Sequence, residues 1–253
     1  MDQLGIEKRL TFSYLICVAM GATASITTGI AWGHWYRTLD QCVFKNCSCI
    51  IYGKNTQSHF LGGDQAPCIW VTYGPLLYVF FAICMSCFHG YRVLFTTKSP
   101  RMHTTRSVVA KMEHGSSVQI TAITQENTSP LPRAFWITLS VFTSFFFTYA
   151  LINFSIFIDG YYTTCNQYRS VLEKSLGVFG TALPVIHRRL YCQSIFDFMD
   201  YMHLDSENAY RNGFINTGLS LIIGLVASCS AWMILLLASI LNITMANKKQ
   251  EYI

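Results

Sequence analysis

Apolar and polar residues follow one another along this chain in long blocks. Four apolar blocks contain no Asp, Glu, Lys or Arg, and polar segments separate them. The shortest of the four runs for 23 residues, from Leu10 to Trp32. A helix rises about 1.5 Å per residue, so this block covers roughly 35 Å and can cross the ~30 Å hydrocarbon core of a bilayer. The pattern predicts an all-α membrane protein built as a four-transmembrane-helix bundle.

The block boundaries give the expected order of segments. Transmembrane helices are predicted at 10–32, 67–91, 134–158 and 213–245. Loops at 33–66, 92–133 and 159–212 join them, with short ends at 1–9 and 246–253. Gly74-Pro75 should kink the second helix, because proline removes a backbone donor. The stretch Val108–Met112 can seed a short helix in a segment otherwise expected to be a flexible loop.

A rival interpretation concerns the first block. Ala22-Thr23-Ala24 fits the cleavage site of a secretory signal peptide, so residues 1–24 can also be read as a leader that is removed. The uncharged run continues to Trp32, which gives it span length and an aromatic end and favours a retained helix. Both interpretations leave the rest of the chain in the same orientation.

Composition and charge support a membrane class and set its orientation. Only 12% of the residues are charged, against about 25% in soluble domains. The ends and the 92–133 loop together carry 10 Lys or Arg against 5 Asp or Glu, whereas the other two loops carry 8 of each. Basic residues gather on the cytoplasmic side of membrane proteins. We therefore expect a multi-pass protein of the plasma membrane or a secretory-pathway membrane, with cytoplasmic termini.

The cysteines point to the same orientation independently. Five of the ten lie in the two loops predicted to be extracellular, and a sixth, Cys68, lies at the outer edge of the second span beside the first of these loops; the six are Cys42, Cys47, Cys49, Cys68, Cys165 and Cys192. Such a distribution indicates disulfides in an oxidising compartment. Cys165 and Cys192 are alone in their loop and should pair. The other four should pair among themselves, although Cys47 and Cys49 are too close in sequence to pair easily.

Several motifs are candidates for modification or binding. Asn46 begins an N-x-S sequon in the first external loop, although early disulfide formation at Cys47 would block the glycan. The second external loop has two patches of opposite charge, which are either a partner-binding surface or solvated residues of a helix at 195–202. The patch residues are Arg188, Arg189, Asp197 and Asp200. In the cytoplasmic segments, phosphorylation is expected at Ser99, Thr104, Ser107 and Ser129, and a PDZ-type contact through Glu251, Tyr252 and Ile253.

The chain offers little to catalysis. It has no catalytic motif and no metal-ligand spacing among its external histidines, so we expect no enzyme, cofactor or metal. Cys84-Met-Ser-Cys87 is a C-x-x-C, but Cys84 lies about 24 Å along the helix from Cys68, so two packed thiols are the simpler interpretation. Palmitoylation of Cys87 near the cytoplasmic interface is a second alternative. His89 is either a pH-sensing group or a residue at the headgroup boundary. Asn153 and Asn216 are expected to make interhelical hydrogen bonds.

A second line of inference rests on likeness. Its residues are Cys68 followed by Gly74-Pro75, the helix exit His89-Gly-Tyr-Arg92-Val-Leu-Phe, Cys165, Cys192 with Phe196 and Asp197, then Asp205, Tyr210 and Trp232. In this layout the chain resembles the transmembrane protein 179 family. The resemblance implies a four-span membrane protein, prominent in neural tissue, with no assigned activity. The cluster Cys42, Cys47 and Cys49 departs from that family, as does the length of the 92–133 loop.

These observations rank three hypotheses. The first is a non-enzymatic membrane protein that acts by association, for example as an auxiliary subunit of a channel or receptor. Its expected partners are the lipid bilayer and another membrane protein, with no nucleic acid. The second is a small transporter or channel, although intramembrane charge is almost absent from the chain. The third is a membrane thiol oxidoreductase that uses Cys84 and Cys87.

Overall fold

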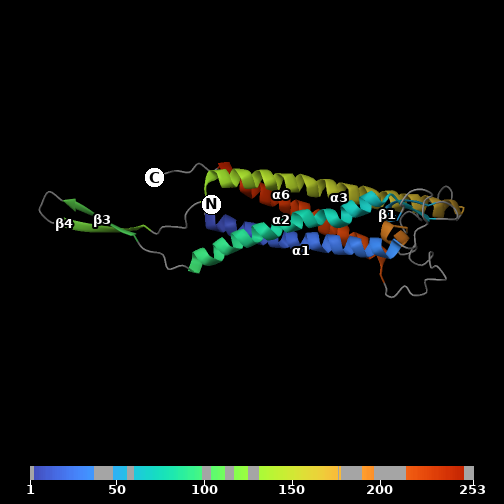
Figure 1. The fold of residues 1–253 in the computed structure, drawn as a ribbon, viewed down its shortest axis with the longest axis horizontal. Coiled ribbons are helices and arrows are strands. Elements are labelled where there is room, and N and C mark those ends of the chain that lie inside the picture. The colour runs from blue at the N-terminus through green and yellow to red at the C-terminus, as the bar shows by residue number, and fades with distance from the viewer. Residues whose placement is uncertain are drawn as a thin grey trace.

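The computed structural model describes residues 3–36, 48–55, 60–98, 104–111, 117–124, 131–175, 177, 190–196 and 215–247. Within these ranges four long helices run side by side (Figure 1). They are α1 (Gln3–Trp35), α2 (Gln65–Lys98), α3 (Arg133–Ser175) and α6 (Thr217–Asn247). Each is long and apolar enough to cross a membrane. The start of α1 and the end of α6 lie at the same end of the bundle.

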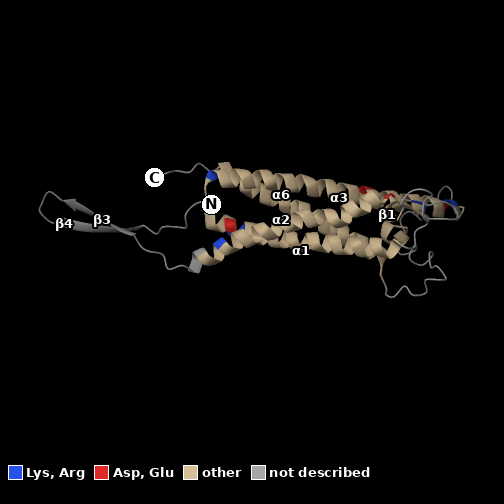
Figure 2. Cartoon of the chain, in the orientation of Figure 1, with Lys and Arg blue, Asp and Glu red and all other residues tan. Residues whose placement is uncertain are grey.

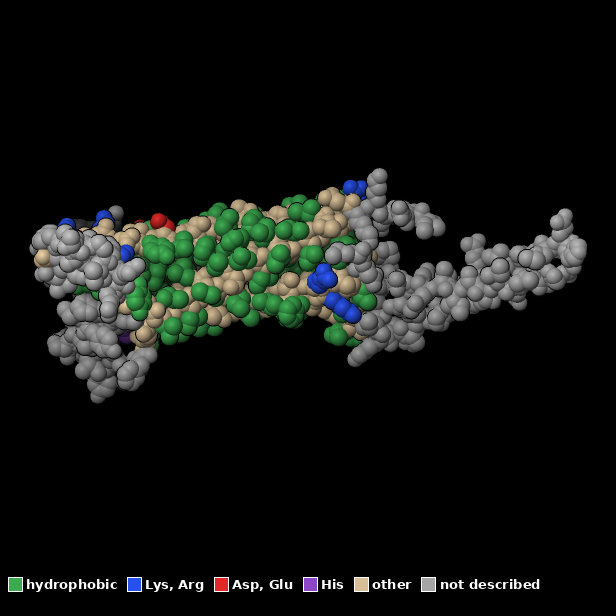
Figure 3. Space-filling view, turned by 180° about the vertical axis from the view of Figure 1, so that it is seen from behind, with side chains coloured by type: hydrophobic (Ala, Val, Ile, Leu, Met, Phe, Trp, Pro, Cys, Tyr) green, Lys and Arg blue, Asp and Glu red, His purple; other side chains and the backbone are tan. Residues whose placement is uncertain are grey.

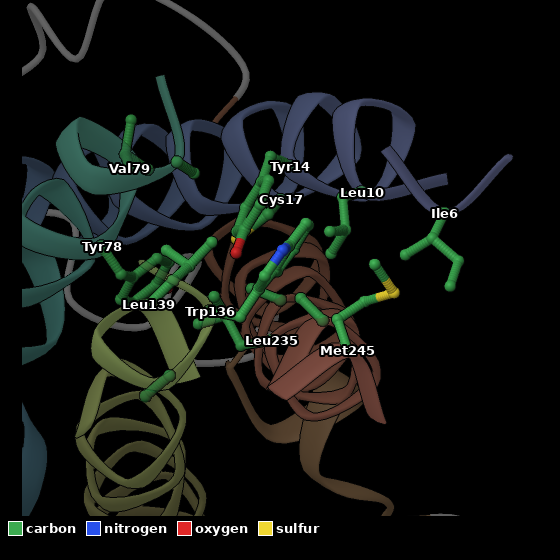
Figure 4. Close-up of a cluster of buried hydrophobic side chains, with 14 of the residues drawn as sticks. Ile6, Leu10, Tyr14, Cys17, Tyr78, Val79, Trp136, Leu139, Leu235 and Met245 are labelled. Atoms are coloured by element: carbon green, nitrogen blue, oxygen red, sulfur yellow. The ribbon is translucent and has the colours of Figure 1, made fainter. Parts of the chain in front are cut away.

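The helices do not all pack equally closely. Helix α1 packs along α2 and α6, and α6 packs along α3, whereas α2 and α3 touch over a smaller surface. Two clusters of buried side chains form the interior, one toward each end of the bundle. Figure 4 shows the cluster near the chain ends, where Leu10 and Tyr14 of α1 meet Trp136 of α3 and Leu235 and Met245 of α6.

Many large apolar side chains lie on the outside of the bundle, whereas small residues lie at the helix contacts beside large buried side chains such as Tyr14. Phe80 is 71% exposed and Val141 64%, whereas Ala24 and Ala231 are fully buried. Apolar side chains cover the middle of the face seen in Figure 3, and the charged residues drawn in Figure 2 lie toward the two ends. Membrane helices pack through small residues and present large apolar ones to lipid. The arrangement is consistent with a multi-pass membrane protein.

Two short hairpins accompany the helices, so the all-α prediction describes most of the chain but not all of it. Strands β1 (Cys49–Asn55) and β2 (Phe60–Gly63) pair antiparallel, with an irregularity between Cys49 and Lys54. Strands β3 (Thr104–Lys111) and β4 (Ser117–Thr124) also pair antiparallel. The short helix expected at Val108–Met112 is therefore wrong for residues 108–111, which lie in β3. β-branched valines favour a strand once a partner strand is present.

Helix α3 also extends further than the sequence suggested. It continues to Ser175, past the expected end of the third span at Ile158, so 159–175 is helix and not loop. Its buried residues keep helical spacing from Phe157, inside the predicted span, through Tyr161, Cys165 and Tyr168 beyond it. The helix continues because this face is covered by β1 and by residues 190–196.

Candidate functional site

The end of the bundle opposite the chain ends is held by two disulfides. Cys49–Cys68 joins β1 to α2, and Cys165–Cys192 joins α3 to residues 190–196. Their Cα–Cα distances are 5.6 and 5.4 Å. The predicted Cys165–Cys192 pair is confirmed, and Cys49–Cys68 is one of the pairings left open for the other four cysteines. Cys42 and Cys47 lie outside the described residues.

Hydrogen bonds fasten β1 to α3 as well. The hydroxyl of Thr164 accepts a 3.0 Å bond from the Gly53 amide and donates a 3.0 Å bond to the Ile50 carbonyl. Thr164 is fully buried, so these bonds form in a site closed to water. Strand β1 is thereby fixed on α3 by backbone contacts and on α2 by the disulfide. We call this assembly of β1, β2, residues 159–175 and residues 190–196 the disulfide-linked end.

Tyr52 is the strained point of the disulfide-linked end. Its φ is 61°, in the left-handed region that non-glycine residues seldom adopt. Its hydroxyl donates to Asp159 Oδ2 at 2.8 Å and to the Ile156 carbonyl at 3.2 Å. Loss of water contact and the hydrogen bond to the Asp159 carboxylate raise the pKa of Tyr52 to about 12. The backbone strain is offset because this conformation brings the side chain onto α3.

Glycines allow this close approach. A Cβ added to Gly160 would lie 2.8 Å from Cε2 of Tyr52 and 3.0 Å from Cβ of Ile51. A Cβ on Gly63 of β2 would run into the carbonyl oxygen of Ile51. The two glycines therefore let β1 fit between α3 and β2, which no larger residue would permit at either position.

The second disulfide anchors a short helical turn. In residues 190–196, Ile195 and Phe196 are fully buried, and the Phe196 ring stacks on Tyr161 at 5.1 Å. Nearby, Trp35 Nε1 donates a 2.9 Å bond to Thr217 Oγ1, which ties the end of α1 to the start of α6. All four long helices thus contribute to one buried cluster at this end.

A polar network lies inside the other half of the bundle, and sequence reasoning missed it. The Asn242 amide donates to Tyr14 Oη at 3.1 Å and to Thr143 Oγ1 at 3.0 Å. Thr143 donates to the Leu139 carbonyl at 2.7 Å, so its oxygen accepts from the Tyr14 hydroxyl 3.3 Å away. Three helices meet in this network, and all three side chains are fully buried. In the sequence Asn242 begins an Asn-Ile-Thr sequon inside an apolar block, which gives no sign of this role.

An ion pair closes the bundle near the chain ends. Arg92 binds Glu7 through Nε at 3.2 Å and through a terminal nitrogen at 3.3 Å, and Glu7 is 2% exposed. His89 stacks between Tyr14, at 6.2 Å, and Trp136, at 6.0 Å. His89 is fully buried inside the bundle, and neither ring nitrogen has a hydrogen-bond partner. Its level relative to the lipid headgroups stays a prediction.

Hydrogen bonds from two neighbouring helices reach α2 near Pro75. The Asn153 amide donates to the Trp70 carbonyl at 2.9 Å, and Ser25 Oγ donates to the Thr72 carbonyl at 2.7 Å. These carbonyls precede Pro75, where the missing donor weakens the helix ladder. The predicted interhelical bond of Asn153 is confirmed. For Asn216 the prediction is wrong, because its side chain accepts from Leu219 N at 2.7 Å and caps the start of α6.

The four cysteines predicted within the helices are free thiols. Cys17 is buried and Cys229 is partly buried, whereas Cys84 and Cys87 are exposed on the outside of α2. The interpretation of Cys84 and Cys87 as thiols packed inside the bundle is therefore wrong. Among the described residues no His, Cys, Asp or Glu group is arranged to hold a metal ion.

Most of the remaining predicted site residues lie outside the part of the chain that the structure describes. Two of them, Thr104 and Ser107, lie in β3. Those outside are Asn46, Ser99, Ser129, Arg188, Arg189, Asp197, Asp200, Glu251, Tyr252 and Ile253. The residues that the structure does bring together are thus the disulfide cysteines and the buried polar groups.

Comparisons of the chain with protein-family models, with curated proteins and with solved structures find no match. The class of protein is therefore defined by the fold and by the disulfide-linked end alone. The resemblance to the transmembrane protein 179 family stays a prediction.

Proposed function

We propose that this is a non-enzymatic multi-pass membrane protein that acts by association, as an auxiliary subunit of a channel or receptor does. The observation that carries the proposal is the disulfide-linked end. Two disulfides, the bonds of Thr164 and the clamp of Tyr52 on Asp159 hold it in one arrangement. Pre-ordered surfaces bind partners at a lower entropic cost than flexible ones.

We place the disulfide-linked end outside the cell or in the secretory lumen, and the chain ends in the cytoplasm. Disulfides persist in oxidising compartments, and the excess of basic residues belongs to the other side. Leu10 and Tyr14 are fully buried against the other helices, which supports a retained first helix over a leader cleaved after Ala24. The resemblance to the four-span family agrees with this arrangement.

The charged patches of the second external loop are the part we assign to the partner. Arg188-Arg189 and Asp197 with Asp200 lie on either side, in sequence, of the anchored residues 190–196. Cys192, Ile195 and Phe196 fix that short segment on α3. Loops carried on a rigid support are the usual place for recognition. Charge of both signs would give the contact specificity and a fixed orientation.

Co-purification from native membranes after brief cross-linking, read by mass spectrometry, tests the proposal. We expect a reproducible channel or receptor partner with the wild-type chain, and its loss with Arg188→Ala/Arg189→Ala. Lys54→Ala is the matched control, because Lys54 is an exposed basic residue of β1 at the same end. Equal recovery with all three proteins would refute the assignment of the patch. Absence of any reproducible partner would refute association.

A small transporter or channel is the second candidate. The buried groups favour it, since the His89 nitrogens and the Asn242 carbonyl oxygen lack hydrogen-bond partners inside the bundle. An apolar layer opposes it. Along their helices, the buried residues Val79, Ala150, Ala231 and Leu235 lie between the Asn242 network and the bonds around Pro75, and they belong to one buried hydrophobic cluster. Substrate-dependent flux in proteoliposomes of the pure protein would favour this candidate over association.

A thiol oxidoreductase is the third candidate, and the position of its thiols opposes it. Cys84 lies sixteen residues along α2 from Cys68, about 24 Å from the disulfides with which it would exchange. Redox activity that is unchanged by Cys84→Ala would dispose of this candidate.

A further inference from the structure

The four free thiols of the described chain differ in what surrounds them. Cys17 is buried and Cys229 is partly buried, whereas Cys84 and Cys87 are exposed. The two exposed thiols lie one turn apart on a strip of exposed side chains that follows α2 at spacings of three and four residues. The strip consists of Tyr73, Leu77, Phe80, Cys84, Cys87 and Tyr91.

The ion pair fixes the level of these thiols along the bundle. Arg92 binds Glu7 near the beginning of α1, where the adjacent Lys8 and Arg9 are exposed. Cys87 precedes Arg92 by five residues, about 7.5 Å of helix, and Cys84 by eight, about 12 Å. Both thiols therefore lie just inside the charged end of the bundle, far from the disulfide-linked end.

We propose that Cys84 and Cys87 are sites of S-acylation by a long-chain acyl-CoA. The proposal rests on the orientation given under the proposed function, because acyl-CoA is supplied from the cytoplasm. The thiol sulfur attacks the thioester carbonyl of acyl-CoA, a new S–C bond forms, and the bond between the acyl carbon and the coenzyme sulfur breaks. The thiol proton ends on the released coenzyme thiol. The exchange is redox-neutral and needs no other reactant.

The strip gives the attached chains a place to lie. From Cys87 to Tyr73 it covers 15 residues of α2, a rise of about 21 Å, and its apolar side chains face away from the bundle. Leu77 is 58% exposed and Phe80 is 71% exposed, so an acyl chain can cover them without moving the helices. Cys17 has no such access. Acylation would change the lateral surface of α2 and leave the bundle and the disulfide-linked end as they are.

An acyl-exchange assay on the full chain in cell membranes tests the proposal. Free thiols are blocked with N-ethylmaleimide, thioesters are cleaved with hydroxylamine, and the released thiols are coupled to a polyethylene-glycol maleimide under non-reducing conditions. We expect two hydroxylamine-dependent mass steps for the wild type and one each for Cys84→Ser and Cys87→Ser. The double variant should show none. Cys17→Ser and Cys229→Ser are matched controls and should keep both steps.

Two results would overturn the proposal. One is a wild-type chain with no hydroxylamine-dependent step, and the other is a step that persists in the double variant. The same sample separates this failure from failure of the orientation, because Asn127-Thr-Ser lies in the segment placed in the cytoplasm. A glycan on Asn127 would overturn the orientation and the acylation together. A missing step without that glycan would overturn the acylation alone.

Discussion

Tyr52 and Asp159 are 107 residues apart in the chain, and the hydroxyl of Tyr52 donates a 2.8 Å hydrogen bond to the Asp159 carboxylate. This bond ties a strained residue of β1, with φ 61°, to the level at which α3 leaves the predicted span. The bond needs a protonated phenol. It should therefore stabilise the disulfide-linked end at neutral pH and stop doing so at strongly alkaline pH.

The first prediction concerns that pH dependence. Tyr52 has a pKa of about 12 in the folded chain, above its ordinary value near 10. Because the folded pKa is raised, the stabilisation is fully present below pH 10 and is lost as the pH rises through about 12. Tyr52→Phe should be less stable than the wild type at pH 8, and the two stabilities should converge above pH 12.

Thermal unfolding in detergent between pH 8 and 12 measures this difference. N-ethylmaleimide must first block the free thiols, since thiolates would attack the disulfides at alkaline pH. Tyr162→Phe is the control, because Tyr162 is an exposed tyrosine of α3, 52% accessible. Its curve should follow the wild type. If the gap between Tyr52→Phe and wild type stays constant from pH 8 to 12, the bond to Asp159 does not set the pH dependence.

The second prediction separates the disulfides from the bundle. The paired cysteines are 19 residues apart in one disulfide and 27 in the other. Loops of these lengths correspond to a stabilisation of about 3 kcal/mol each on the chain-entropy model. Replacing either pair by serine should lower the unfolding midpoint but leave the far-ultraviolet helix signal unchanged, because the helices pack along their length without the disulfides. Loss of helix signal in either variant would contradict this separation.

The third prediction compares two glycines of α1. A Cβ on Gly21 would run into Val79 and lie 2.7 Å from Cε2 of Tyr78, whereas a Cβ on Gly33 meets no atom within 4 Å. Gly21→Ala should destabilise the bundle by about 1–3 kcal/mol through overpacking. Gly33→Ala should be neutral or stabilising by about 0.5 kcal/mol, because alanine loses less backbone entropy. Equal effects in thermal unfolding would show that α1 does not pack on α2 at Gly21.

The sequence predicted the four long helices because uncharged apolar runs of this length are typical of membrane-spanning helices. It predicted Cys165–Cys192 because only two cysteines remained in that loop. It placed the end of the third span at Ile158 because Asp159 interrupts the apolar run. The helix continues through Asp159, whose carboxylate stays exposed and binds Tyr52. The spacing of Phe157, Tyr161 and Cys165 was a signal of this continuation.

Other features depend on contacts between distant segments and leave little mark on a local pattern. Strand β1 bends at Tyr52 and docks on Thr164 of α3, so its seven residues do not alternate like an ordinary strand. Asn242 acquires its role only when α1 and α3 bring Tyr14 and Thr143 to it. Glu7 looked like part of a solvated end, because its partner Arg92 is 85 residues away.

The fourth prediction tests the Asn242 network by a double-mutant cycle. Asn242→Leu and Thr143→Val each remove the 3.0 Å bond between the two side chains. Their combined effect should be smaller than the sum of the single effects by about 1 kcal/mol, within the range for hydrogen bonds inside membrane bundles. Thr148→Val is the control on α3, since the exposed Thr148 donates to the Ser144 carbonyl of its own helix. The effect of Thr148→Val on the free energy of unfolding should simply add to that of Asn242→Leu. Strict additivity for Thr143→Val would show that the bond contributes nothing.

The fifth prediction uses the unequal burial of an ion pair. The Glu7 side chain is 3% exposed and that of Arg92 is 18% exposed. Arg92→Met would leave a buried carboxylate without its guanidinium and should cost about 3–5 kcal/mol. Glu7→Gln should cost only about 1 kcal/mol, because the amide can still accept from Arg92 and the guanidinium can reach the headgroups.

The free energies of unfolding of the two single variants and of their double variant, measured in lipid nanodiscs, test this prediction. The double variant should be more stable than Arg92→Met, because it removes the unpaired carboxylate. Arg133→Met is the matched control, since Arg133 donates to the neutral Ala246 carbonyl at 3.1 Å and pairs with no acid among the described residues. Arg133→Met should lower the free energy of unfolding by about 1 kcal/mol. If Arg92→Met and Arg133→Met are equally stable, the Glu7 carboxylate is reached by water and the ion pair does not close this end of the bundle.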